Sequence, residues 1–184
     1  MTTAFRRYRG FSLLETTLVV CLVAVLTTAA LGHFQKMRAN TERTAMRQQL
    51  ESLREALRLQ IGSRLLRHHG RHLAGLPIEN PFDWLERRPD NYGGEITRLD
   101  TALEAGKWYY HTKSAQLIYQ VRHSEQFRGG VGDFPRIQFK IFMNFADRNS
   151  DGRFDYRSDE FQGAQLNAVV PYRWGSATPE SPED

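Results

Sequence analysis

The stretch Arg6-Arg7-Tyr8-Arg9-Gly10-Phe11-Ser12-Leu13-Leu14-Glu15 decides how this 184-residue chain is organised. Its three arginines stand directly before an apolar segment that reaches Leu31. A segment of roughly 20 apolar residues, at about 1.5 Å rise per residue, crosses a hydrocarbon core of about 30 Å. The arginines predict that the N-terminus stays in the cytoplasm and that the chain after His33 is exported. The sequence therefore predicts a single-pass membrane protein.

Glu15 is the only acidic residue of this apolar segment. A carboxylate well inside a membrane span costs about 2.5–3.5 kcal/mol on insertion scales, so such a residue usually has a function and a partner. One alternative is that Glu15, close to the start of the span, reaches the polar head groups. A second is an ordinary cleaved secretory signal ending near Ala29 and Ala30, although such signals have no carboxylate near the start of their apolar core.

Gly10, Phe11 and Glu15, within this basic-then-apolar frame, resemble the prepilin-type cleavage and methylation motif of type IV pilins and type II secretion pseudopilins. The resemblance implies that a prepilin peptidase cuts between Gly10 and Phe11 on the cytoplasmic face of the bacterial inner membrane. It also implies that the new Phe11 amine is methylated and neutralises Glu15 of a neighbouring subunit in a filament of packed N-terminal helices. The best-attested use of such a buried ion pair is to set the register of packed helices, here the axial position of one subunit's helix against the next.

Pattern and resemblance together divide the chain into consecutive parts. Apolar residues at 4-3-4-4 spacing predict a helical face that packs on a sheet: Met46, Leu50, Leu53, Leu57 and Ile61. A coiled coil is the alternative, although the stripe lasts little more than two heptads. The expected parts are a leader (1–10), a transmembrane or filament-core helix (11–32), its amphipathic second half (33–69), a globular domain (70–175) and a disordered acidic tail (176–184).

The globular part carries strand signals after a loop-like stretch from Leu76 to Glu95. Trp108–Tyr110 and Leu117–Val121 predict a hairpin, and Ile137–Phe145 alternates apolar residues on one face. Large apolar residues in the loop predict a buried anchor: Phe82, Trp84, Leu85 and Tyr92. The expected fold is α+β, a long helix packed on a small antiparallel sheet, as in the lollipop-shaped pilin fold.

Four short pieces of this region are similar to globular domains of minor pilins of the mannose-sensitive-haemagglutinin kind. They are Asn80-Pro81, Tyr92 to Glu95, Trp108 to Tyr110 and Leu117 to Val121.

The segment 147–160 resembles the first part of an EF-hand-type calcium loop. Oxygen-bearing residues fall at positions one, three, five and nine, with glycine at position six and a backbone carbonyl available at position seven: Asp147, Asn149, Asp151, Asp155, Gly152 and Arg153. The twelfth position is Ser158 rather than glutamate, so Asp159 or Glu160 would have to close a structural Ca²⁺ site. The alternative is an ion-free connection rich in Asx turns.

The remaining composition favours a structural protein over an enzyme. The lone Cys21 lies in the span, so no intrachain disulfide can form. The basic cluster from Arg64 to His72 complements the dipole at a helix C-terminus, and we favour this interpretation over a metal site or a nucleic-acid interface there. No catalytic constellation is recognisable.

We therefore expect a minor pilin or pseudopilin of a type IV pilus or type II secretion filament, with its domain in the periplasm. Its partners would be prepilin peptidase, other subunits and the inner membrane. The alternative function is a membrane-anchored periplasmic calcium-binding or adhesive module that does not polymerise. A DNA-binding competence pilin, using Arg64, Arg67 and Arg71, is the third hypothesis.

Overall fold

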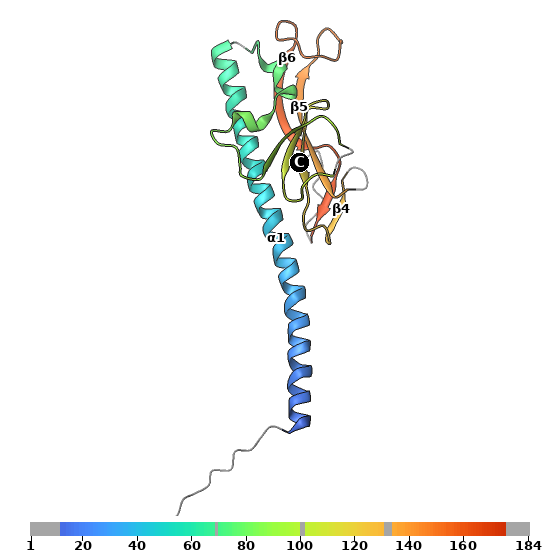
Figure 1. Cartoon of the computed structure of the whole chain (residues 1–184). Helices are drawn as coiled ribbons and strands as arrows, with labels where there is room; N and C mark the ends of the chain where they lie inside the picture. Colours follow the sequence, from blue (N-terminus) through green and yellow to red (C-terminus); the bar gives the residue numbers. More distant parts are fainter. Residues whose placement is uncertain (1–11, 69, 100–101, 131–133, 176–184) are drawn as a thin grey trace, which may run out of the picture. The chain divides into compact units, whose positions relative to one another are not determined.

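The computed structural model describes residues 12–68, 70–99, 102–130 and 134–175 (Figure 1). It divides into two compact units, residues 1–38 and 39–184, and helix α1 (Leu13–His68) contributes to both. The predicted leader, with Gly10 and Phe11, and the predicted tail 176–184 lie outside the described residues.

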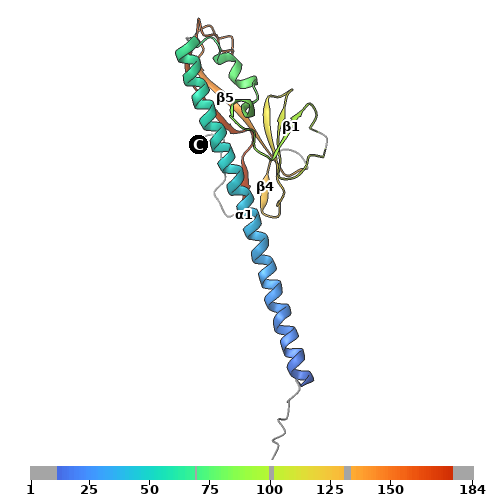
Figure 2. The ribbon, with the colours of Figure 1, turned by 60° about the vertical axis from the view of Figure 1, so that its left-hand side comes forward.

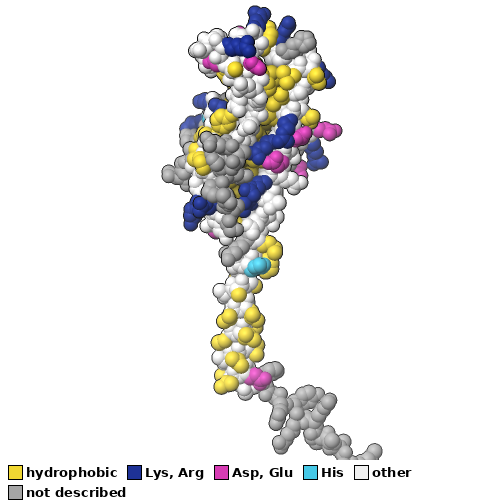
Figure 3. All heavy atoms as spheres, turned by 180° about the vertical axis from the view of Figure 1, so that it is seen from behind, with side chains coloured by type: hydrophobic (Ala, Val, Ile, Leu, Met, Phe, Trp, Pro, Cys, Tyr) yellow, Lys and Arg dark blue, Asp and Glu magenta, His cyan; other side chains and the backbone are white. Residues whose placement is uncertain are grey.

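In the first unit, the described residues form the beginning of α1, with apolar side chains exposed around the helix. Leu13 is 87% exposed and Leu26 is 60% exposed, and Figure 3 shows hydrophobic side chains along this segment with few charged ones among them. An all-round apolar helix is typical of a membrane span. Among the described residues, α1 is the one helix that is long and apolar enough to cross a membrane.

Threonine hydroxyl groups in this segment form hydrogen bonds with backbone carbonyls of the same helix. The hydroxyls of Thr17, Thr27 and Thr28 donate to the carbonyls four residues earlier, at 2.9, 2.7 and 2.8 Å. Because hydrocarbon offers no hydrogen-bond partners, internal satisfaction lowers the cost of placing these residues in a bilayer. The threonines are therefore compatible with a span.

In the second unit, the rest of α1 packs an apolar face against a sheet (Figure 2). Met46, Leu50, Leu53 and Leu57 are at most 2% exposed, and Ile61 is partly buried against the same cluster. The predicted stripe is confirmed. The helix ends at His68, and the Gly70 N–H donates to the Arg64 carbonyl at 3.2 Å with Gly70 in the left-handed region, φ 81°.

The main sheet has five strands in the order β1-β2-β3-β5-β6. They are β1 (Tyr92–Ile96), β2 (Trp108–His111), β3 (Gln116–Gln120), β5 (Arg136–Ala146) and β6 (Glu160–Ala168). A second sheet pairs β4 (Phe127–Gly129) with β7 (Tyr172–Trp174). The predicted hairpin, β2 with β3, and the predicted alternating strand, β5, are confirmed.

The prediction of a wholly antiparallel sheet is wrong, because β1 pairs with β2 in parallel. Strand β1 overlaps the end of the stretch from Leu76 to Glu95, which its glycines and prolines predicted to be a loop. Gly93 is needed in this strand, since a Cβ there would lie 2.3 Å from the ring of Tyr109. A glycine required for close packing thus looked like a turn signal in the sequence.

Two short 3-10 helices overlap or lie within the predicted loop, namely η1 (Leu73–Ile78), which begins three residues before it, and η2 (Pro81–Trp84). Phe82 is fully buried and its ring lies 5.9 Å from that of Trp108, centroid to centroid. Trp84, Leu85 and Tyr92 pack partly buried against the same core. The predicted aromatic anchor is confirmed, and it fixes this segment on the domain.

Candidate functional site

Glu15 lies in the first turn of α1. Its N–H donates to Ser12 Oγ at 3.2 Å, so Ser12 caps the helix, and the Glu15 side chain is exposed. A carboxylate in this turn is favoured by the positive end of the helix dipole. Its expected neighbours in the motif, Gly10 and Phe11, lie outside the described residues, so the cleavage and pairing roles stay predictions.

The predicted calcium loop is the connection between β5 and β6. Counting Asp147 as position one, the N–H of Gly152 at position six donates to Asp147 Oδ2 at 2.8 Å. Asn149, Asp151 and Asp155 each accept from the N–H two residues later, at 3.1, 2.7 and 3.0 Å. The loop therefore folds back on its own side-chain oxygens, as its Asn, Asp and Gly content predicts.

Asp159, rather than Glu160, closes the loop. Asp159 accepts from the N–H groups of Arg148 and Asp155 at 3.2 and 2.8 Å. Glu160 instead forms an exposed ion pair with Arg148 at 2.9 Å. The sequence left both carboxylates open as closing groups, and their positions in the structure favour Asp159.

Two oxygen atoms of this loop bear on the calcium prediction. Asp147 Oδ1 and Ser158 Oγ, at positions one and twelve, are buried without a hydrogen-bond partner among the described residues. Buried polar atoms are normally satisfied, and Ca²⁺ binds oxygen ligands of this kind. Within the described ranges, however, no three His, Cys, Asp or Glu side chains are grouped so as to hold a metal. Part of the donor set fits calcium, and the site stays a prediction.

The basic cluster at the end of α1 has a structural partner that sequence reasoning missed. Arg64 bonds both carboxylate oxygens of Glu79, at 3.0 and 2.5 Å, and the His72 carbonyl at 2.7 Å. The hydrogen bond from Arg64 is the main cause that lowers the pKa of Glu79, against an opposing contribution from burial. Arg64 thus fastens η1 to the end of α1.

A second missed group is Glu42, which joins α1 to the segment after β3. Its carboxylate accepts from the Tyr119 hydroxyl at 2.9 Å and from the N–H groups of Arg122 and His123 at 2.8 and 2.9 Å. His123 Nδ1 lies 2.6 Å from the same carboxylate. Burial, followed by the charge of Glu42, raises the pKa of Tyr119. The sequence signal is that Glu42 stands four residues before Met46 and continues the apolar stripe.

A third contact between helix and sheet runs through Gln49. Its Oε1 accepts from Trp108 Nε1 at 2.6 Å, and its Nε2 donates to Asn91 Oδ1 at 2.7 Å. Together with Glu42, this network fixes both the rotation and the axial position of α1 on its sheet in the second unit.

Comparisons with protein-family models, with curated proteins and with solved structures give no match to this chain. What the structure defines is an α+β protein with an N-terminal helix that is long and apolar enough to span a membrane.

Proposed function

We propose that this protein is a structural subunit, a minor pilin or pseudopilin, of a type IV pilus or a type II secretion filament. Prepilin peptidase would cut between Gly10 and Phe11. The chain would be anchored in the inner membrane with its N-terminus in the cytoplasm and its domain in the periplasm. The observation that carries the proposal is a helix with exposed apolar side chains that begins at Leu13, shortly after the Gly10-Phe11 pair in the sequence. The first turn of this helix holds one carboxylate, that of Glu15.

The physical basis of the proposal is that the exposed apolar surface of this helix has two favourable environments. One is lipid, before assembly, and the other is a bundle of identical or related helices, after assembly. In either environment an unpaired carboxylate is costly. A methylated Phe11 amine of a neighbouring subunit would neutralise Glu15, and the requirement for that pair would set the axial register of the bundle.

The contacts in the second unit support a role in which helix position matters. A subunit that meets its neighbours through α1 needs the sheet fixed relative to that helix. Glu42 and Gln49 supply polar contacts of defined geometry, which specify one arrangement more narrowly than apolar packing does.

A structural calcium ion in the 147–160 loop is a second proposal, favoured by the unpartnered oxygens of Asp147 and Ser158. Asn149, Asp151, Asp155, the Arg153 carbonyl and the closing Asp159 would supply the remaining oxygens. Calcium would stabilise the β5–β6 connection by binding the folded loop in preference to the unfolded one.

Replacing Glu15 distinguishes the filament-subunit proposal from the alternative of an anchored module that does not polymerise. Glu15→Ala should leave the protein in the membrane fraction but remove it from sheared filaments, detected with an antibody against the domain. Glu55→Ala, an exposed glutamate further along the same helix, is the matched control and should assemble normally. Normal incorporation of Glu15→Ala would favour the anchored module.

A further inference from the structure

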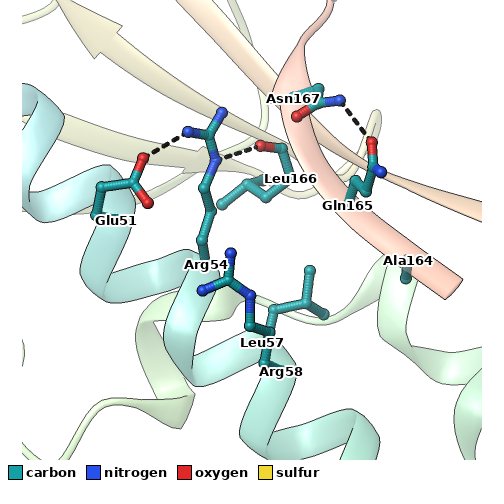
Figure 4. A pocket seen from close by; sticks show the side chains of 8 residues that line it. All are labelled: Glu51, Arg54, Leu57, Arg58, Ala164, Gln165, Leu166 and Asn167. Atoms are coloured by element: carbon teal, nitrogen blue, oxygen red, sulfur yellow. Dashed lines mark hydrogen bonds and ion pairs between the residues drawn. The ribbon is translucent and has the colours of Figure 1, made fainter. Parts of the chain in front are cut away.

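Several arginines near the surface of the second unit already have a carboxylate partner. Figure 4 shows one of them: Arg54 bonds Glu51, one turn earlier on α1, at 2.6 Å, and the backbone carbonyl of Leu166 on β6 at 3.0 Å. Further pairs are Arg58 with Glu55, Arg87 with Asp90, Arg88 with Asp83 and Arg148 with Glu160. Their charges are balanced locally, so these surfaces do not require an external anion.

Arg128 and Arg173 differ from these pairs, because they lie directly opposite each other. Strand β4 pairs with β7 so that Arg128 is the partner of Arg173 across the ribbon. Both side chains are exposed, whereas Phe127, Tyr172 and Trp174 on the other face of the ribbon are buried. Directly opposite side chains of an antiparallel pair have their Cβ atoms about 4.5–5.5 Å apart, and like charges in that position are destabilising.

The charge of this arginine pair is not balanced by its surroundings. Arg128 donates from Nη1 to the neighbouring Phe127 carbonyl at 3.0 Å, and within the described ranges neither arginine forms an ion pair with a carboxylate. The segments that hold the pair, 121–130 and 171–175, contain three arginines and a single acidic residue, Glu125. The fold therefore keeps two guanidinium groups side by side against their repulsion, and an anion shared between them would offset that repulsion.

The ribbon lies at the end of the second unit where α1 enters it. A Cβ on Gly175, the residue after β7, would lie 3.3 Å from Nη1 of Arg43, which follows the first residue of this unit, Ala39, by one helical turn. Figures 1 and 2 both show β4 at this end of the unit. Residues 32–38 alone separate Ala39 from the apolar segment that reaches Leu31. A chain of this length spans at most about 25–30 Å, whatever the orientation of the two units, so an anchored protein keeps this end close to the membrane surface.

We propose that Arg128 and Arg173 together bind the phosphate of an anionic phospholipid headgroup on the periplasmic surface of the inner membrane. Guanidinium groups match phosphate oxygens in a bidentate geometry, and the buried aromatic side chains behind the ribbon hold the two groups in place. Binding would orient the second unit on the membrane before assembly. The inference rests on the membrane anchoring that the filament subunit and the anchored module share, and not on cleavage or polymerisation.

The test uses the full chain in nanodiscs, with Cys21→Ser and a fluorophore attached to Gln126→Cys, and measures quenching by a lipid whose headgroup carries a nitroxide. Position 126 lies beside the ribbon, since its carbonyl accepts from the Gly175 N–H at 3.0 Å. We expect stronger quenching in discs that contain phosphatidylglycerol than in discs of phosphatidylcholine alone, and a decline of the difference with added salt. An arginine near an anionic surface favours association about fivefold, so the double variant Arg128→Gln/Arg173→Gln should lower the ratio of docked to undocked protein about 25-fold.

The double variant Arg67→Gln/Arg71→Gln is the matched control. It removes the same charge from exposed arginines at the other end of the second unit. Arg67 lies roughly 36 Å along α1 from Arg43 at 1.5 Å per residue, well beyond a Debye length of about 10 Å. Its expected effect on the ratio of docked to undocked protein is below about twofold. In phosphatidylcholine discs, Arg128→Gln/Arg173→Gln should unfold at the same temperature as the unmodified chain or higher, because it removes the repulsion between the strands.

Several results would overturn the inference. Equal quenching in the two kinds of disc would do so, as would unchanged quenching in Arg128→Gln/Arg173→Gln. An equal loss in the control variant would mean attraction of the overall charge rather than a site. Dependence on phosphatidylglycerol that emerges only after residues 176–184 are deleted would assign the arginines to the predicted acidic tail, and abolition by inorganic phosphate at matched ionic strength would assign them to the free anion. None of these outcomes depends on whether Glu15→Ala enters filaments, so this inference and the proposed function fail separately.

Discussion

Glu42→Gln is the sharpest test of how the second unit holds its helix. The glutamate side chain is 10% exposed, and its two oxygens accept from Tyr119, from two backbone N–H groups and from the His123 ring. A glutamine of the same shape keeps one oxygen acceptor, but its NH₂ group would face donors at His123. About half of the charge-assisted bonds are therefore lost.

The magnitude follows from those lost bonds. A hydrogen bond to a charged group contributes about 1.5–3 kcal/mol, so losing two, with some relaxation of the loop, should lower the unfolding free energy by about 3 kcal/mol. For a chain of this size, that corresponds to a fall in Tm of about 6–12 °C. The assay is urea and thermal unfolding of the full chain in detergent, followed by tryptophan fluorescence, because Trp108 and Trp174 are both buried in this unit.

The control is Glu55→Gln on the same helix, where the glutamate is exposed and forms an i,i+3 pair with Arg58. Its expected cost is below about 0.5 kcal/mol, since exposed i,i+3 pairs contribute little. A loss below about 1 kcal/mol for Glu42→Gln, close to that of the control, would refute the view that this carboxylate fastens the helix to the sheet.

Three further predictions concern other parts of the second unit. Gly93→Ala should lower the free energy of unfolding by about 1–3 kcal/mol, because the added methyl group overpacks the Tyr109 ring. Gly62→Ala has open space at its Cβ and should raise the free energy of unfolding by up to about 1 kcal/mol. Equal effects of the two variants in urea unfolding would contradict this prediction. The folded-state pKa of Glu79 is lowered from its ordinary 4.5, so its stabilising contribution is present above that value and is lost as the pH falls through the lowered pKa. In Glu79→Gln the free energy of unfolding should therefore fall less steeply as the pH is lowered through this range. An unchanged pH dependence would exclude the Arg64–Glu79 ion pair as a cause of the loss of stability in acid. Calcium at a hundredfold excess over its Kd should raise stability by about 2.7 kcal/mol relative to chelator in a thermal shift assay. Asp147→Ala should remove that gain while Glu160→Ala keeps it, and no gain in the unmodified chain would leave the loop ion-free.

The parts of the fold that the sequence predicts are those with strong local patterns. The 4-3-4-4 stripe predicts which face of α1 is buried, and the aromatic and β-branched runs predict β2, β3 and β5. Strand β6 is poor in β-branched residues and rich in glutamine and small residues, so its pairing with β5 depends on tertiary context. The parallel direction of β1 and the pairing of β4 with β7 likewise have no local signal.

The candidate site divides in the same way. Turn chemistry in the 147–160 loop is local, so the Asx-type bonds of Asn149, Asp151 and Asp155 follow from the sequence. The choice of Asp159 over Glu160 depends on where the chain re-enters the sheet. The spacing before Met46 places Glu42 on the buried face of α1, but the partners of Glu42 and Glu79 lie far along the chain, so the sequence could not assign their contacts.

The most direct test of the central proposal is the intact mass and N-terminal sequence of the membrane-extracted protein, made with and without co-expressed prepilin peptidase. The filament-subunit proposal predicts that, with the peptidase, the chain begins at a methylated Phe11, and that without it the leader is retained. A chain that still begins at Met1 with the peptidase present, or one that begins after Ala30, would contradict the proposal.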